Sequence, residues 1–280
     1  MTLNRSQVTA LLEANDVRPS RALGQNFVAD ANTVRRIVRL AGVGAGDRVV
    51  EIGAGLGCLT MALAEVGADV TAIEIDKRMV PILRAGVEPL GVRVIEGDAT
   101  ALAWDEVLDP GLGSWALVAN LPYNVATPLV LDLLDLVPQV DSILVMVQRE
   151  VAERLAAGPG TKAYGGASVK VAYWATAAVV GMVPASVFVP KPNVESALVR
   201  IVRRPDGPAV DPMVVTHEHL FGLVRRGFSQ RRKMLRGLLA DVVSPAAFAA
   251  AGIDPTRRAE DLDVHDWGRL ATAAARERAE

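Results

Sequence analysis

The feature that most constrains the fold of this chain is an apolar stretch that runs directly into a glycine-rich loop. Residues 48–52 have the pattern of a buried strand, Gly53 to Gly57 follow the pattern Gly-x-Gly-x-Gly, and a helical pattern continues to residue 64. Glycines let a ligand approach the backbone closely, and the amides at the start of a helix face that ligand. The order strand, glycine loop, helix therefore predicts a nucleotide-binding unit at the edge of a parallel sheet.

The next two predicted strands indicate which nucleotide is bound. Glu74 lies near the end of the strand at residues 69–75, 21 residues after Gly53, where a carboxylate binds the two ribose hydroxyls. A third strand, residues 92–95, leads to Asp98, whose carboxylate is placed to accept from an adenine amino group. Cys58 stands where Gly-x-Gly-x-x-Gly would have its last glycine. This difference disfavours NAD and suits adenosylmethionine, which has no pyrophosphate.

The fourth predicted strand, residues 115–119, ends in the stiff loop Asn120-Leu121-Pro122-Tyr123. Pro122 fixes its own φ and pushes Leu121 towards an extended backbone. Such a loop suits a planar ring with an exocyclic amine. The ring stacks on Tyr123, while the Asn120 side-chain oxygen and the Leu121 carbonyl accept the two amine hydrogens. Two acceptors favour a pyramidal nitrogen and free its lone pair, mainly in the transition state.

Glu74, Asp98 and Asn120 end successive strands of this sheet, which is where doubly wound folds bind their ligands. An ordinary surface turn is the alternative for each residue alone, and the set of three is what favours a site. Phe188, in Val-Phe-Val-Pro-Lys-Pro, is followed closely by two prolines. We expect its ring to be the second face of a sandwich around the base that stacks on Tyr123. A core phenylalanine is the alternative.

Length and composition bound the architecture. The chain has 280 residues, of which 51% are hydrophobic, and no apolar run approaches the roughly 20 residues that span a bilayer. The first 16 residues lack the features of a signal peptide, and a single cysteine, Cys58, excludes an internal disulfide, so we expect a cytoplasmic protein. The linker-like run at 203–208 separates a predicted α/β domain, residues 1–204, from a helical domain, residues 205–280.

The remaining predicted elements are shorter. Further strands are expected at 142–147, 178–184 and 197–202, of which the last two form a hairpin-like pair, and a flexible loop is expected at 161–166. Helices beyond the linker are expected at 216–226, 231–239, 245–251 and 264–275.

The net charge of −2 argues against a nucleic-acid partner, but the distribution of the charge does not. Residues 200–236 contain nine basic and three acidic side chains. A basic face on a nearly neutral protein indicates a polyanionic partner, and a solvated helix face is the alternative. We expect no metal site, because His217 and His219 face different sides of a helix without a third ligand nearby. The predicted RNA-binding residues are Arg225, Arg226, Arg231, Arg232, Lys233 and Arg236.

Nine short motifs occur in order over nearly the whole chain. They are GQNF (24–27), EIGAGLG (51–57), EID (74–76), GDA (97–99), NLPYN (120–124), KAYG (162–165), VFVPKPNVES (187–196), FSQRRKMLR (228–236) and GIDPxRRAE (252–260). Most are weak alone, and together they are specific. With these motifs the chain resembles the KsgA family of small-subunit ribosomal RNA adenine dimethyltransferases. Val28-Ala29 and Gly165-Gly166-Ala167 depart from the usual family residues, and the second departure leaves the order of that loop open.

The resemblance implies a Rossmann-like class I methyltransferase sheet with a smaller all-helical C-terminal domain. It implies transfer of two methyl groups from S-adenosylmethionine to N6 of each of two adjacent adenines near the 3′ end of small-subunit RNA. The expected partner is this RNA within a pre-30S ribosomal particle, bound by a monomer without a membrane or a metal. The implied catalytic residues are Asn120, Leu121, Tyr123 and Phe188. The implied cofactor-binding residues are Gln25, Asn26, Val28, Glu51, Gly53, Gly55, Glu74, Ile75, Asp98, Ala99 and Asn120.

Two alternatives remain at this point. The erythromycin-resistance methyltransferases share Asn-Leu-Pro-Tyr but act on large-subunit RNA, and the long tail with its GIDP and RAE residues favours the small subunit. A non-catalytic ribosome-assembly or transcription factor on a methyltransferase fold is the second alternative. The complete set of Glu51, Gly53, Glu74, Asp98 and Asn120 argues against it.

Overall fold

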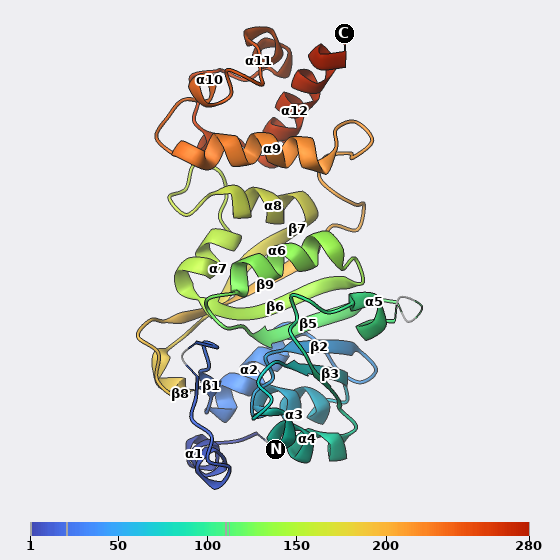
Figure 1. The fold of residues 1–280 in the computed structure, drawn as a ribbon, viewed down its shortest axis with the longest axis vertical. Helices are drawn as coiled ribbons and strands as arrows, with labels where there is room; N and C mark the ends of the chain where they lie inside the picture. Colours follow the sequence, from blue (N-terminus) through green and yellow to red (C-terminus); the bar gives the residue numbers. More distant parts are fainter. Residues whose placement is uncertain (1, 21, 110, 112, 280) are drawn as a thin grey trace. The chain divides into compact units, whose positions relative to one another are not determined.

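The computed structural model describes residues 2–20, 22–109, 111 and 113–279, which form two compact units (Figure 1). The first unit comprises Met1–Ala152 and Ala178–Val202, and the second comprises Glu153–Ala177 and Arg203–Glu280. The chain passes into the second unit close to the boundary predicted at 204/205. Residues 153–177, which we predicted in the first domain, instead group with the second unit, because Tyr164, Val169 and Tyr173 pack in its core.

A seven-stranded sheet with the order β4-β3-β2-β5-β6-β9-β7 organises the first unit. Strands β4, β3, β2, β5 and β6 are parallel to one another, whereas β9 runs antiparallel to β6. The pair predicted at 178–184 and 197–202 is present as β7 and β9, which are neighbours in the sheet. The strands are β2 (Arg48–Ile52), β3 (Asp69–Glu74), β4 (Arg93–Glu96), β5 (Trp115–Asn120), β6 (Val140–Gln148), β7 (Ala175–Val183) and β9 (Ser196–Arg203).

Helices cover the sheet and complete the core of the first unit. One layer packs α2, α3 and α4 against alternate strand residues such as Val49, Val118 and Leu144. The residues between them point to the opposite face, and α6 packs against β6. Burial on both faces explains why 142–147 is a continuous apolar run. The elements are α1 (Arg5–Ala14), α2 (Ala31–Ala41), α3 (Cys58–Glu65), α4 (Val80–Val87), η1 (Glu88–Leu90), α5 (Trp104–Val107), α6 (Ala126–Leu136), α7 (Arg149–Leu155) and η3 (Ala185–Val187).

A second, two-stranded sheet joins segments that are far apart in the sequence. Strand β1 (Phe27–Val28) pairs antiparallel with β8 (Phe188–Val189), and the Ala29 amide extends the pairing by donating to the Val187 carbonyl at 2.8 Å. Helix α1 supports β8, since the Arg5 guanidinium donates to the carbonyls of Ser186 and Phe188. The GQNF and VFVPKPNVES motifs are thus neighbours in the fold.

The second unit is built mainly from helices around a core that includes Trp267, Phe248 and Leu220. Its elements are α8 (Gly166–Trp174), α9 (His217–Gly227), η4 (Phe228–Gln230), α10 (Leu235–Leu238), α11 (Pro245–Ala251), η5 (Ala259–Asp261) and α12 (Val264–Ala279). None of the helices in the described part of the chain is long and apolar enough to cross a membrane.

The helix predicted at 231–239 is wrong for residues 231–234 and for residue 239. Only Leu235–Leu238 are helical, because the preceding backbone pairs with another segment of the chain. Met234 forms a bridge with Arg258, and the amides of Leu235 and Arg236 donate to the carbonyls of Arg257 and Pro255, each at 2.9 Å. The GIDPxRRAE motif therefore holds residues 231–234 of the basic FSQRRKMLR motif in a non-helical conformation.

Candidate active site

Two adjoining cavities lie at the carboxyl ends of the parallel strands, one of about 70 Å³ and one of about 150 Å³. They share the wall residues Leu23, Gly53, Ile75 and Pro122. The first cavity is also lined by Gln25, Asn26, Val28, Glu51, Gly55, Glu74, Asn120, Leu121 and Tyr123, and the second by Asp98 and Ala99. The structure thus brings together all the predicted cofactor-binding residues and three of the four predicted catalytic residues.

In the loop after β2, position 55 requires a glycine both for its backbone conformation and for lack of space. Gly55 has a φ of +58°, and a Cβ at this position would lie 2.8 Å from Cε1 of Phe27. Its amide also donates to the Glu74 carboxylate at 2.7 Å. The loop therefore lies tightly between β3 and β1, and any larger residue at position 55 would displace one of these walls.

Glu74 ends β3 with its carboxylate held by two backbone amides. Gly55 donates to one oxygen at 2.7 Å, and Asp76 donates to the other at 2.8 Å. The side chain is only 4% exposed, and burial raises its pKa in spite of these two hydrogen bonds. Because a carboxylate has about four acceptor positions, two remain for a ligand with paired hydroxyls, such as a ribose.

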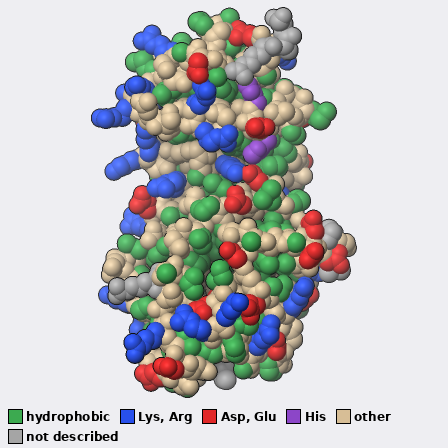
Figure 2. All heavy atoms as spheres, viewed as in Figure 1, with side chains coloured by type: hydrophobic (Ala, Val, Ile, Leu, Met, Phe, Trp, Pro, Cys, Tyr) green, Lys and Arg blue, Asp and Glu red, His purple; other side chains and the backbone are tan. Residues whose placement is uncertain are grey.

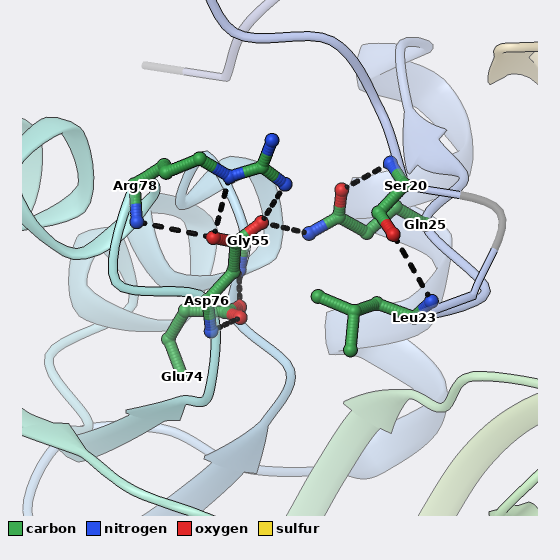
Figure 3. Close-up of polar contacts among 7 residues, drawn as sticks. All are labelled: Ser20, Leu23, Gln25, Gly55, Glu74, Asp76 and Arg78. Carbon is green, nitrogen blue, oxygen red and sulfur yellow. Dashed lines mark hydrogen bonds and ion pairs between the residues drawn. The ribbon is translucent and has the colours of Figure 1, made fainter.

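The sequence did not reveal a second carboxylate beside Glu74. Asp76 is 6% exposed and accepts from both Nε and Nη2 of Arg78, at 3.0 and 2.7 Å, and from the side chain of Gln25 at 2.9 Å (Figure 3). The Arg78 guanidinium is the main reason that the pKa of Asp76 falls to about 2. The EID motif contains Asp76, but no local pattern could have shown that Gln25, 51 residues earlier, is its partner.

Asp98 and its neighbours form the wall of the second cavity. One oxygen of the carboxylate accepts from the amide of Thr100 at 2.9 Å and from its hydroxyl at 2.7 Å, and these bonds lower the pKa of Asp98. This turn fixes an ionised carboxylate after β4, as predicted from the position of Asp98. Its second oxygen accepts no hydrogen bond from the residues that the structure describes, so it can accept one from an amino group.

The side chain of Asn120 has a defined orientation at the end of β5. Its Nδ2 donates to the Asn26 carbonyl at 2.9 Å, so its Oδ1 is the atom left to accept a hydrogen bond from a ligand. The Leu121 amide donates to the Met146 carbonyl at 3.1 Å, which fixes the backbone of the loop by extending the pairing with β6. The Leu121 carbonyl has no protein donor among the described residues.

Tyr123 lies on the wall of the first cavity with its hydroxyl anchored. The hydroxyl forms a 2.8 Å hydrogen bond with Oγ of Ser196, a residue of β9 that is completely buried. Partial burial raises the pKa of Tyr123, so the phenol is neutral at physiological pH. The anchored ring is suited to stacking rather than to proton transfer.

Phe188 does not have the exposed face that we predicted. The side chain is 0% exposed and packs in the core layer that contains Val34 and Ile37 of α2. It is also absent from the residues lining either cavity. In this conformation the structure favours the alternative, a core phenylalanine, because β8 pairs with β1 and directs the ring into the core.

Glu51 contributes an unpartnered carboxyl oxygen to the first cavity. The residue is 2% exposed, and its buried Oε2 has no hydrogen-bond partner in the described structure. Burial raises the pKa of Glu51 to about 8, against a smaller opposing effect of the nearby Thr60 hydroxyl. Burial and the neighbouring Glu51 together raise the pKa of the Cys58 thiol to about 12. Both groups are therefore neutral at pH 7 without a ligand.

The basic residues of the second unit divide into paired and unpaired side chains. Arg226 forms an ion pair with Asp241, and Arg231 forms one with Glu260 at 2.7 Å. No hydrogen bond or ion pair of the side chains of Arg225, Arg232 and Lys233 is found among the described residues. Hydrogen bonds from Thr256 are the main reason that the pKa of Asp254 is lowered, and the nearby charge of Arg236 contributes a smaller part. Figure 2 shows Lys and Arg side chains gathered on the second unit along the side where α9 leads into α10.

Arg231 also anchors the loop that we predicted to be flexible. Its guanidinium donates to the Lys162 carbonyl at 2.6 Å, and the Tyr164 hydroxyl donates to the Leu262 carbonyl at 2.9 Å. The amide of Gly160 adds a bond to the Glu260 carbonyl at 2.8 Å. The KAYG, FSQRRKMLR and GIDPxRRAE motifs thus form one connected surface of the second unit.

Comparison with known proteins identifies the family. The model of the family described as "Ribosomal RNA adenine dimethylase" matches residues 18–276. The chain belongs to this dimethylase family. Among its relatives, the "Ribosomal RNA small subunit methyltransferase A" of Cutibacterium acnes is 48% identical over 98% of this chain and 94% of the relative. The protein of the same name from Leifsonia xyli subsp. xyli is 47% identical over 96% of this chain and 97% of the relative.

Solved structures of two methyltransferases share the fold of this dimethylase. A dimethyladenosine transferase from Plasmodium falciparum has a TM-score of 0.71 at 24% identity, covering 86% of this chain and 94% of its own. The 23S rRNA methyltransferase ErmE has a TM-score of 0.69 at 24% identity, covering 89% and 99%. The predicted class I methyltransferase fold is confirmed. Family membership confirms an rRNA adenine-dimethylating enzyme that uses S-adenosylmethionine.

Proposed function

We propose that this protein transfers two methyl groups from S-adenosylmethionine to N6 of each of two adjacent adenines near the 3′ end of small-subunit ribosomal RNA. The orientation of Asn120 carries the proposal. Its amide nitrogen is occupied by the Asn26 carbonyl, and its oxygen therefore acts as an acceptor beside the cavity. Relatives named small-subunit methyltransferases align along almost the entire chain, which supports the small subunit as the source of the RNA.

The residues of the two cavities fit S-adenosylmethionine, which supplies a methyl group on a positively charged sulfur when bound. Glu74 retains two acceptor positions for the ribose hydroxyls, and Asp98 retains an oxygen for the adenine amine. Glu51 offers a buried carboxyl oxygen without a partner, which suits a cationic ligand. Gly55 leaves no room for a side chain, because a Cβ there would meet the ring of Phe27, which lines the first cavity. We assign Gly53, Ile75 and Ala99 to the same cavity walls.

The amine clamp consists of two acceptors and one ring. Asn120 Oδ1 and the Leu121 carbonyl accept the two hydrogens of the adenine amine, and the ring of Tyr123 stacks on the base. Both hydrogen bonds would strengthen as the amine nitrogen gains positive charge in the transition state of methyl transfer. No carboxylate is needed as a base at this point, because the methylated ammonium is acidic and loses its proton to water after transfer.

The target adenine must leave its helix or loop to reach the clamp. Flipping a base costs a few kcal/mol, and stacking contributes roughly 1–3 kcal/mol per base, so Tyr123 offsets a substantial part of this cost. A second stacking surface at Phe188 would require residues 187–189 to move out of the core. We therefore assign stacking on the base to Tyr123 and not to Phe188.

The second unit supplies the phosphate contacts. Arg225, Arg232 and Lys233 have exposed side chains without protein partners among the residues described, so their charges are available to RNA. We assign Arg226 and Arg231 to holding this surface together, and Arg236 to a weaker contact because Asp254 lies near it. The proposed partner is the RNA within a pre-30S particle in the cytoplasm, with the enzyme acting as a monomer.

Labelled S-adenosylmethionine tests this function directly. The protein is incubated with small subunits that lack the modification and, separately, with large-subunit RNA, and the modified bases are mapped. We expect two adjacent dimethyladenines in the small-subunit RNA and no label in large-subunit RNA. Label in the large-subunit RNA alone would favour the erythromycin-resistance activity, and no label in either would favour a non-catalytic assembly factor.

A further inference from the structure

The segment of residues 22–25 forms part of the wall of both cavities. Leu23 lines both of them, Gln25 lines the first, and Ala22 lines the second. Gly24 is close to Pro122 of the amine clamp, since a Cβ on it would lie 3.1 Å from the proline Cβ. Any ligand that occupies the two cavities together contacts this segment.

Hydrogen bonds within the chain give this segment a closed shape. The Gln25 amide donates to the Ser20 carbonyl at 3.1 Å, and the Ser20 amide donates to the Gln25 side-chain oxygen at 2.7 Å. The Leu23 amide donates to the Ser20 hydroxyl at 3.3 Å. These bonds fix the shape of the segment. Asn124 Nδ2 also donates to the Ala22 carbonyl at 3.4 Å, and one further contact attaches the segment to the residues that follow β3.

Asp76 provides that attachment, as Figure 3 shows. The Gln25 Nε2 donates to Asp76 at 2.9 Å, while the Arg78 guanidinium binds both oxygens of the same carboxylate. The side-chain oxygen of Gln25 accepts from the Ser20 amide, while its side-chain nitrogen donates to Asp76. The side chain of Gln25 therefore connects Ser20 to Asp76. The Asp76 amide in turn donates to Glu74, the carboxylate assigned to the ribose. A continuous chain of hydrogen bonds therefore connects Ser20 to the ribose site.

We propose that Gln25, Asp76 and Arg78 form a latch that holds residues 22–25 against the bound cofactor, and that Asp76 is its positioning residue. The latch rests on the proposed function, because it assumes that S-adenosylmethionine occupies both cavities. Asp76 is ionised, since its partner Arg78 holds the pKa of the carboxyl near 2. Its contact with Gln25 is thus a hydrogen bond to a charged group, which is stronger than a neutral one. Loosening the latch removes a wall of the site and so speeds cofactor release.

Stopped-flow displacement of S-adenosylhomocysteine from the full-length protein tests the latch. Asp76→Asn should raise the dissociation rate constant about tenfold, the effect of losing one charge-assisted hydrogen bond. The association rate constant should change much less, since the cavity remains. Gln25→Glu should also speed release, because it places two carboxylates face to face. The double variant Gln25→Glu/Asp76→Asn restores an amide–carboxylate pair in the opposite direction and should return the dissociation rate to within about threefold of wild type.

Asp69→Asn is the matched control, because it removes the same charge from the exposed first residue of β3, the strand that ends two residues before Asp76. It should leave both rate constants unchanged. Dissociation from Asp76→Asn and Gln25→Glu at the wild-type rate would overturn the latch, as would a double variant that is as fast as the single variants. A wild-type protein that binds no S-adenosylhomocysteine would overturn the proposed function itself, and the latch with it.

Discussion

The ionisation of Glu51 gives the most direct test of the electrostatics of the site. In the unfolded chain this carboxyl titrates near its ordinary value of 4.5, whereas burial raises its pKa to about 8 in the folded protein. Between these two values unfolding releases the Glu51 proton. Rising pH therefore favours the unfolded state, and the stabilising effect of the neutral acid, complete below pH 4.5, is lost as pH rises towards 8.

The size of the effect follows from this difference in pKa. Each pH unit within this window lowers the free energy of unfolding by about 1.4 kcal/mol through this one group. Between pH 5.5 and 7.5 we therefore expect Glu51 to contribute a loss of about 2.5–3 kcal/mol. The Glu51→Gln variant has no titratable group at this position. Between pH 5.5 and 7.5, the free energy of unfolding of this variant should therefore fall by about 2.5–3 kcal/mol less than that of the wild type. A constant cost of burying the glutamine amide would shift the whole curve without changing this slope.

Urea unfolding of wild type and Glu51→Gln at pH 5.5, 6.5 and 7.5, followed by tryptophan fluorescence, measures the difference. Carbon-13 NMR of the Glu51 carboxyl gives its pKa independently. Addition of S-adenosylmethionine should lower that pKa, because its positive charge favours the carboxylate, and calorimetry at pH 7 should detect release of close to one proton per bound cofactor. Equal pH slopes for the two proteins, together with a Glu51 pKa below about 6, would refute the reasoning.

Three further predictions concern the cofactor, the amine clamp and the RNA surface. Glu74→Gln should weaken S-adenosylhomocysteine binding by roughly 1.5–3 kcal/mol in titration calorimetry, and unchanged affinity would remove Glu74 from the ribose site. Asn120→Ala should lower the single-turnover methylation rate on the order of 10²–10³-fold at saturating cofactor, whereas the exposed Asn32→Ala should not, and a near wild-type rate for Asn120→Ala would contradict the clamp. Arg232→Gln/Lys233→Gln should flatten the salt dependence of small-subunit binding by about one unit of slope for each phosphate that the variant no longer neutralises. Arg226→Gln, which removes a side chain already paired with Asp241, should keep the wild-type slope, and equal slopes for all these proteins would assign the basic residues to a solvated surface.

The sequence predicted the cofactor edge of the sheet because the relevant information is local. A glycine loop after a strand and polar residues at the ends of the next strands are short patterns, and parallel pairing then places Glu74, Asp98 and Asn120 at one edge. The structure places these three residues on the two cavities as expected.

The contacts that the sequence did not reveal join residues far apart in the chain. Gln25 meets Asp76 across 51 positions, and Phe188 is buried because β8 pairs with β1, more than 150 positions earlier. The segment 231–234 has a helical pattern, but tertiary pairing with residues 255–258 overrides its local preference. The paired state of Arg231 likewise depends on Glu260, which no charge count within residues 200–236 includes.

The grouping of residues 153–177 with the second unit has a consequence for how the chain is made. A ribosome releases the chain in order, so Tyr164, Val169 and Tyr173 emerge roughly 100 residues before Trp267, their partner in the core. The first unit has all its residues once Val202 has emerged. Residues 153–177, an apolar segment inserted between its two parts, stay uncovered until the C-terminal helices have been made. A fragment cut at the linker near residue 204 would keep that exposed segment, and the remaining fragment would lack part of its own interior. The two parts of this sequence on either side of the linker are therefore not two independent folding units.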